Sequence, residues 1–227
     1  MVCTIHCKPA NTCSIKKKIK AINWLAHNVI QLEVPKPKGF EYNVGDAVEI
    51  KVNDQEPGPF TMTNLPGEGR LEFVIRVYAE HHGKTEALSR LKPGDEISFT
   101  EPFNTFQPQK RAVFLAGGTG ITPFIAIMRY MQKQDTLADC FLFFSNKTRK
   151  DLFLEEELTD MLGDHFQNII ANDKDDPDYY GNIDEAWLKA HIDDLSRPVL
   201  VCGPPAFNEA MEKALKSIGV RDIDLGS

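Results

Sequence analysis

The feature that most constrains the fold of this chain is a change in hydrophobic periodicity near residue 110. Up to residue 108, short extended runs are separated by turn segments rich in proline and glycine, such as "PKPKG", "YNVGD" and "LKPGD". The extended runs lie at 14–22, 28–34, 47–52, 70–78 and 96–100. Short strands with turns of this kind, and one short helix near 84–91, predict a small antiparallel barrel.

The second half of the chain alternates apolar strands with helical patterns. We expect strands at 112–116, 140–144, 166–171 and 198–202, followed by helices at 121–132, 152–162, 183–192 and 206–219. Such repetition is typical of a parallel sheet covered on both faces. The sequence therefore predicts two domains: an antiparallel β-barrel over residues 1–108, and a doubly wound α/β domain with a parallel sheet over residues 109–227.

The first strand of the second half ends in a glycine-rich turn, "LAGGTGITPF". Gly117, Gly118 and Gly120 let the backbone approach a bulky anion, and the following helix would point free N–H groups at it, which suits a diphosphate. The turn is not a complete G-x-G-x-x-G, because Pro123 stands at the last glycine position, and it lacks the Lys-Ser/Thr pair of a P-loop. A tight packing corner is the alternative interpretation.

Three motifs resemble the nucleotide-binding half of the ferredoxin–NADP reductase family, which includes cytochrome b5 reductase and flavodoxin reductases. They are "LAGGTGITPF", "FFSNKTRKDLFLEEEL" and "LVCGPPAFNEAM", in the family's order and roughly its spacing. The resemblance implies sites for the diphosphate and the nicotinamide ring of a dinucleotide. The implied diphosphate residues are Gly117, Gly118, Thr119 and Gly120, the implied nicotinamide neighbours are Cys202, Gly203, Pro204 and Pro205, and the Thr122 hydroxyl would lie close to a flavin.

The first half resembles the family's flavin-binding half, with one departure in "GPFTMTNLP". Gly58 stands where the family has an arginine, and Phe60 stands where it has a tyrosine. The resemblance implies flavin contacts from Phe60, Thr61, Arg76, Val77 and Tyr78, and a phosphate grip from Gly83, Lys84 and Thr85. Loss of the arginine should weaken FAD retention unless Lys84 or Arg76 compensates. Taken alone, "GPFT" would be an ordinary buried strand.

The choice between NADH and NADPH rests on the loops after the second and third strands of the second half. Ser145, Lys147 and Arg149 are possible partners of a 2′-phosphate, although basic loop residues are usually just solvated. The acidic loop "ANDKDDPD" points the other way, because Asp173 could accept a hydrogen bond from a ribose hydroxyl. The sequence leaves both coenzymes open.

The resemblance implies an FAD-dependent NAD(P)H oxidoreductase that passes electrons to a separate carrier, a flavodoxin, a ferredoxin or an oxygenase component. Thr61, near flavin N5, and Cys202, beside the nicotinamide, are the catalytic candidates. We expect Cys202 to orient rather than attack, since no histidine lies nearby in sequence. Two alternatives stay open: a flavin or ferric reductase with loosely bound flavin, and a non-catalytic nucleotide-binding subunit. The ending "RDIDLGS" lacks the flavin-stacking aromatic of many family members.

Composition and spacing argue against several other classes. A net charge of −7 disfavours nucleic-acid binding. We expect a cytoplasmic monomer without a membrane span, because the chain has neither a long apolar run nor a signal-peptide pattern at its start. We expect no metal site, because Cys3, Cys7 and Cys13 do not have zinc or iron–sulfur spacing and the histidines form no ligand pattern. His81 and His82 should lie on a turn surface.

Overall fold

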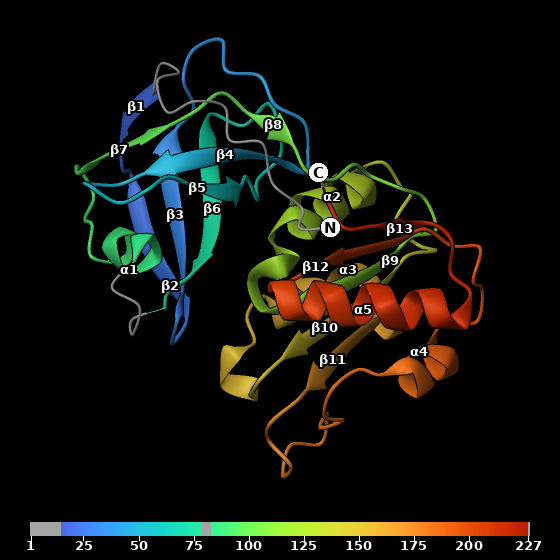
Figure 1. Ribbon diagram of the computed structural model, residues 1–227. Helices are drawn as coiled ribbons and strands as arrows, with labels where there is room; N and C mark the ends of the chain where they lie inside the picture. Colours follow the sequence, from blue (N-terminus) through green and yellow to red (C-terminus); the bar gives the residue numbers. More distant parts are fainter. Residues whose placement is uncertain (1–14, 79–82, 227) are drawn as a thin grey trace.

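The computed structural model describes residues 15–78 and 83–226. These residues form two domains that lie side by side (Figure 1). The first contains antiparallel sheets and the second a parallel sheet flanked by helices. This arrangement confirms the predicted fold class. The predicted turn surface at His81 and His82 and the role of Cys3, Cys7 and Cys13 fall outside the described residues.

The first domain is built from two antiparallel sheets. One has the order β1-β7-β4-β5 with β8 paired to β4, and the other has the order β2-β3-β6. The strands are β1 (Ile15–Lys18), β2 (Ala21–Ala26), β3 (Val29–Pro35), β4 (Asp46–Lys51), β5 (Gly58–Thr61), β6 (Arg70–Arg76), β7 (Glu96–Phe99) and β8 (Phe103–Asn104), and helix α1 (Lys84–Ser89) lies between β6 and β7 in the sequence.

The extended run expected at 14–22 is divided between the two sheets. Ile19 is only 2% exposed, and its N–H donates to the carbonyl of Asp95, the residue before β7. The next N–H, of Lys20, donates to the carbonyl of Glu33 in β3. The chain therefore passes from one sheet to the other at Ile19, and the two sheets enclose one core that includes Phe73 and Phe99.

The second domain has a five-stranded parallel sheet in the order β11-β10-β9-β12-β13. Its strands are β9 (Val113–Gly117), β10 (Phe141–Asn146), β11 (Phe166–Ile170), β12 (Val199–Cys202) and β13 (Ile223–Asp224), and its helices are α2 (Thr122–Lys133), α3 (Glu155–Leu162), α4 (Glu185–His191) and α5 (Pro205–Ile218). Alternate residues of each strand face opposite layers. Phe114 packs with the α2 and α3 side, while Val113 and Leu115 pack with α4 and α5, which explains the continuous apolar runs.

Three local features were not predicted from the sequence. The helix expected from residue 152 begins only at Glu155, because Leu154 adopts a left-handed conformation with φ 58° that a helix cannot continue. The chain end, for which no element was expected, adds β13, whose Ile223 pairs with Val199 of β12. Asp184 was not predicted as a cap, but its carboxylate accepts the N–H of Trp187 and fixes the start of α4.

Apolar and polar contacts join the two domains. Val44, Val74 and Phe106 of the first domain belong to the same buried cluster as Phe124 of α2. On the same helix, Arg129 donates to the carbonyl of Thr63 and to Glu72 of β6, and it also pairs with Glu157 of α3. The helix that follows the glycine turn is thus tied to the first domain. Within the described residues, no helix combines the length and apolarity needed to cross a membrane.

Candidate active site

The glycine turn lies at the carboxyl end of β9. Gly117 ends the strand, Gly118 begins a 3₁₀ turn with φ +56°, and α2 starts directly afterwards. A Cβ atom on Gly120 would lie 2.0 Å from the carbonyl oxygen of Cys202. Glycine at position 120 therefore lets the turn pack against the end of the neighbouring strand.

Two of the glycines at this edge accommodate Phe207 of α5. A Cβ atom on Gly117 would lie 2.9 Å from its ring, and one on Gly203 would lie 2.6 Å from it. Packing thus accounts for part of the glycine pattern, as the alternative interpretation of the sequence held. The two loops predicted to hold one dinucleotide are adjacent, because the strands before them are parallel neighbours in which Ala116 pairs with Cys202.

The thiol of Cys202 is not activated. Burial raises the pKa of Cys202 to about 12, so the thiol stays protonated at neutral pH. In the described part of the chain, no group of three or more His, Cys, Asp or Glu side chains could hold a metal ion. Cys202 can therefore contribute packing and orientation but not nucleophilic attack.

Arg76 connects the end of β6 with the second domain. Its guanidinium donates to the carbonyl oxygen of Asp151 at 3.1 Å and to Oδ1 of Asn146 at 3.4 Å. A Cβ atom on Gly118 would lie 3.2 Å from its Nη1. The arginine predicted to line the flavin is thus also placed beside the glycine turn, where the two domains meet.

Asp151 receives contacts from both domains. Asn28 donates to its Oδ1 at 3.0 Å, and Thr148 donates to its Oδ2 through the backbone N–H and the hydroxyl. Burial by itself would raise the pKa of Asp151, but these hydrogen bonds and the nearby charge of Arg76 outweigh burial and hold that pKa below its usual range. Asp151 is therefore an ionised anchor of the domain junction, and the sequence analysis did not single it out.

Three buried polar atoms of this junction lack a hydrogen-bond partner within the described residues: Nε of Arg76, Nδ2 of Asn146 and Oδ1 of Asn28. Leaving such a group unsatisfied costs about 1–3 kcal/mol, so native structures rarely keep them without a ligand or water. Two of the three atoms are donors, and Arg76 lies at the glycine turn. The residues present therefore fit an acceptor-rich group such as the diphosphate of a dinucleotide.

The predicted flavin residues lie at the end of β5 and at or just after the end of β6. Phe60 is partly buried, and Thr61 is 9% exposed. Tyr78 is 45% exposed, and its N–H donates to the hydroxyl of Thr85. Val77 is partly buried, with its N–H on the carbonyl of Asn28. A partly exposed aromatic ring and a buried hydroxyl suit a planar cofactor with polar edges.

The phosphate grip predicted at 83–85 lies against β5. Gly83 precedes α1, and the side chain of Lys84 crosses Gly58, with its Nζ donating to the carbonyl of Pro57 at 2.8 Å. A Cβ atom on Gly58 would lie 2.6 Å from Cδ and Nζ of Lys84. A cation therefore occupies the place where the arginine is missing, which fits an anionic cofactor.

The loops predicted to read the coenzyme lie at the carboxyl ends of β10 and β11. Ser145 is partly buried within β10 and Lys147 is exposed. Arg149, by contrast, is held by Asp176, with Nε–Oδ2 at 2.7 Å. A hollow of about 440 Å³ is lined by Thr148, Arg149, Lys150, Asp173 and Asp176, so the structure brings the basic and acidic loops together.

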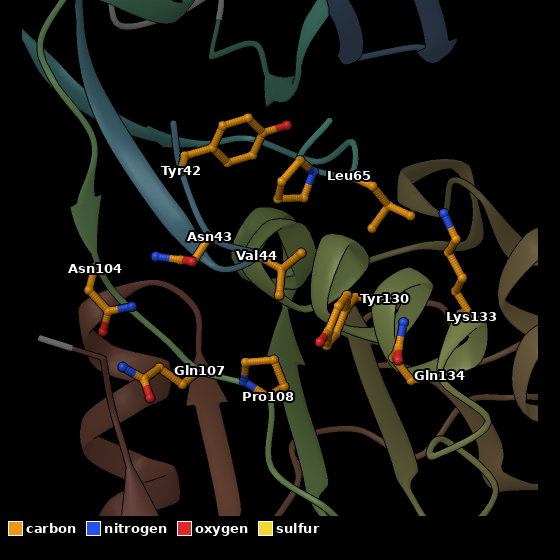
Figure 2. Close-up of a pocket in the computed structure, with 11 residues that line it drawn as sticks. Tyr42, Asn43, Val44, Leu65, Asn104, Gln107, Pro108, Tyr130, Lys133 and Gln134 are labelled. Atoms are coloured by element: carbon orange, nitrogen blue, oxygen red, sulfur yellow. The ribbon is translucent and has the colours of Figure 1, made fainter. Parts of the chain in front are cut away.

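A second hollow, of about 580 Å³, lies between the domains at the far end of α2 (Figure 2). Tyr42 and Leu65 line it from the first domain, and Tyr130 and Lys133 line it from α2. It includes none of the predicted site residues. The length of α2 places it roughly 18 Å from the glycine turn, so it is separate from the candidate site. Its wall comes from four segments that are distant in the sequence, 42–44, 65–66, 104–108 and 130–134, and no local sequence pattern could have predicted it.

Comparisons with known proteins identify the two domains. Residues 14–122 match the family model of an FAD-binding domain, and residues 114–213 match that of an oxidoreductase NAD-binding domain. The chain is 26% identical to the ferredoxin–NAD(P)(+) reductase component of the naphthalene 1,2-dioxygenase system of Pseudomonas putida, over 91% of this chain and 66% of the relative. It is 30% identical to NADH-cytochrome b5 reductase 2 of Candida glabrata, over 70% and 58%.

Solved structures show the same fold. The CS-b5R domains of human Ncb5or match with a TM-score of 0.82 at 21% identity, over 95% of this chain and 70% of that one. The cytochrome b5 reductase domain of Ulva prolifera nitrate reductase matches with a TM-score of 0.78 at 19% identity, over 93% and 96%. The chain spans about three fifths to two thirds of the length of the first curated relatives. With an FAD-binding domain followed by an NAD-binding domain, it belongs to the ferredoxin–NADP reductase-like family of oxidoreductases.

Proposed function

We propose that this chain is an FAD-dependent NAD(P)H oxidoreductase that passes electrons from hydride to a separate one-electron carrier. The observation that carries the proposal is the position of Arg76, at the end of a strand of the FAD-binding domain and against Gly118 of the NAD-binding domain. A nicotinamide held at the ends of β9 and β12 would then face the first domain. We place the boundary between the domains at residues 108 and 109.

The proposed roles follow the positions of the side chains. Thr61 would hydrogen-bond near flavin N5, Phe60 and Tyr78 would pack on the ring, and Cys202 would orient the nicotinamide. The remaining proposed contacts to the two cofactors are Arg76, Val77, Gly83, Lys84, Thr85, Gly117, Gly118, Thr119, Gly120, Thr122, Ser145, Lys147, Gly203, Pro204 and Pro205. FAD, when bound, accepts two electrons together as hydride and releases them singly, so the protein has to align two rings and exclude water.

The names of the relatives suggest the class of electron acceptor. One relative is the reductase component of a dioxygenase system, another is that of propane 2-monooxygenase, and others are named cytochrome b5 reductases. We propose a ferredoxin, a flavodoxin, an oxygenase component or a small haem protein as the partner of this chain. The partner would bind as a separate molecule to a monomer.

An anaerobic visible spectrum, taken before and after stoichiometric NADH or NADPH, tests the proposal. Flavin bands that bleach with either nucleotide support it. A protein that stays colourless after incubation with FAD contradicts it and favours a nucleotide-binding subunit. Gly58 favours one further candidate, a flavin or ferric reductase with loosely bound flavin. In that case flavin would be lost on gel filtration, yet added flavin would still be reduced in many turnovers.

A further inference from the structure

Arg149 is the most heavily engaged cation at the nucleotide edge of the second domain. Its Nε and Nη2 contact both carboxylate oxygens of Asp176, at 2.7 and 3.3 Å. Its Nη1 donates to Glu155 at 3.2 Å, and Nη2 also contacts Asp178. All three nitrogens therefore point at carboxylates of the same chain. A bidentate pair of this kind is among the strongest side-chain contacts available to arginine.

The carboxylates that hold Arg149 are themselves fixed by the backbone. The N–H groups of Ala171 and Asn172 donate to the carbonyls of Asn146 and Lys147, so the loop after β11 is attached to the loop after β10. The N–H of Asp178 donates to Asp176 Oδ1 at 2.9 Å. The Asp176 side chain is only 6% exposed. The acceptors are thus in place before any ligand arrives, and Arg149 gives up preorganised partners if it turns away.

The position of this cluster gives it a consequence for nucleotide choice. β10 is the parallel neighbour of β9, and Ser145 pairs with Gly117, so the loop after β10 adjoins the glycine turn. A dinucleotide whose diphosphate lies at that turn extends its adenosine along the carboxyl edge of the sheet. The 2′ position of the adenosine ribose would then fall near the hollow that Arg149 shares with Asp173 and Asp176.

The charges around that hollow disfavour an added phosphate. The two loops and the start of α3, residues 147–157 and 171–178, carry eight carboxylates against four cations: Asp151, Glu155, Glu156, Glu157, Asp173, Asp175, Asp176 and Asp178 against Lys147, Arg149, Lys150 and Lys174. A 2′-phosphate near neutral pH would add close to two further negative charges. Arg149, the only arginine of the set, is already bound to three of the carboxylates.

We propose that the carboxylates of Asp176 and Asp178 sequester Arg149 and thereby make this chain select NADH over NADPH. The inference rests on the proposed function, because it needs the dinucleotide to bind at the glycine turn. The coenzyme preference would then depend on the carboxylates that bind Arg149, and not simply on whether an arginine is present at position 149. On its own, the sequence "SNKTRKD" would favour the opposite coenzyme.

Binding of non-reducing tetrahydro analogues of NADH and NADPH, measured by calorimetry on the FAD-loaded protein, tests the inference. The NADH analogue should bind at least about tenfold more tightly to the unmodified protein, the discrimination expected for one charged contact. The double variant Asp176→Asn with Asp178→Asn should narrow this preference about tenfold or more by freeing Arg149. Arg149→Met should change the ratio of the two dissociation constants by less than about threefold, because the guanidinium does not contact the nucleotide in the unmodified protein.

Asp194→Asn is the matched control, since it breaks another arginine–carboxylate pair, with Arg111, away from the nucleotide edge. It should not change the preference. Tighter or equal binding of the NADPH analogue by the unmodified protein overturns the inference alone. So does a selective loss of NADPH-analogue binding in Arg149→Met, or an unchanged preference in a folded double variant. If neither analogue binds while FAD is retained, the proposed function fails and the inference fails with it.

Discussion

The side chain of Lys84 lies over Gly58 and fills the space that a side chain at position 58 would need. A Cβ atom there would come within 2.6 Å of both Cδ and Nζ of Lys84. The positive charge that family members supply from this strand is therefore supplied here from the start of α1. If that charge serves the same phosphate, the chain exchanges one cation for another and keeps its affinity for FAD.

Lys84→Met should weaken FAD binding. Charged hydrogen bonds contribute about 1.5–3 kcal/mol each, so the dissociation constant should rise roughly tenfold to hundredfold. Equilibrium dialysis or quenching of flavin fluorescence measures the change. Lys92→Met, at an exposed lysine in the turn before β7, should leave FAD affinity unchanged. Moving the cation back to the strand, in Gly58→Arg with Lys84→Met, should restore much of the loss. Equal FAD affinity of Lys84→Met and the unmodified protein would remove Lys84 from the site.

Asp151→Asn should loosen the domain junction in a pH-dependent way. The folded state holds the pKa of Asp151 below its usual range, so its contribution to stability is present above the unfolded pKa and is lost as the pH falls through the folded pKa. We expect a loss of about 1–3 kcal/mol at neutral pH. The difference from the unmodified protein should shrink below about pH 4. Urea unfolding at several pH values measures both, and a pH-independent difference would contradict the ionised role.

The sequence predicted the parts of this structure that depend on local periodicity. The change of period near residue 110 distinguishes the two domains. Strands of the second domain are buried on both faces and therefore need continuous apolar runs. Val113 and Phe114, for example, are consecutive and face opposite layers. The glycine turn was also found, since three small residues between a strand and a helix are a local signal. The contacts of this turn with the Phe207 ring and the Cys202 carbonyl were not predicted.

The features that the sequence did not predict depend on where distant segments meet. The contacts of Asp151 with Asn28 and Arg76 span 123 and 75 residues. The pairing of Arg149 with Asp176 was not predicted from the basic loop, because the acidic loop that holds this arginine follows the next strand. The left-handed Leu154, which delays α3, has no composition signal, since the turn residues glycine and asparagine are absent there.

Gly120→Ala should disturb the edge where the two nucleotide loops meet. The new methyl group would lie 2.0 Å from a backbone oxygen of Cys202, which cannot rotate away as a side chain can. We expect a stability loss of about 1–3 kcal/mol, typical of overpacking, and weaker binding of the nucleotide. Gly69→Ala is the matched control, because it has open space around it and no left-handed φ. It should change stability by less than about 0.5 kcal/mol. A neutral Gly120→Ala would mean that the two strand ends move apart at little cost.

The variant Cys202→Ala tests whether Cys202 only orients the nicotinamide or takes part in covalent chemistry. With a pKa of about 12, the thiol has almost no thiolate at neutral pH, so it cannot serve as a nucleophile or donate a proton readily. We expect hydride transfer to FAD in Cys202→Ala to fall by no more than about tenfold, which corresponds to a loss of ring alignment. Iodoacetamide should not label Cys202 near pH 8, as peptide mass spectrometry would show. A loss of roughly a thousandfold or more, together with rapid labelling, would instead require a thiolate, and burial could not then be the dominant influence on this cysteine.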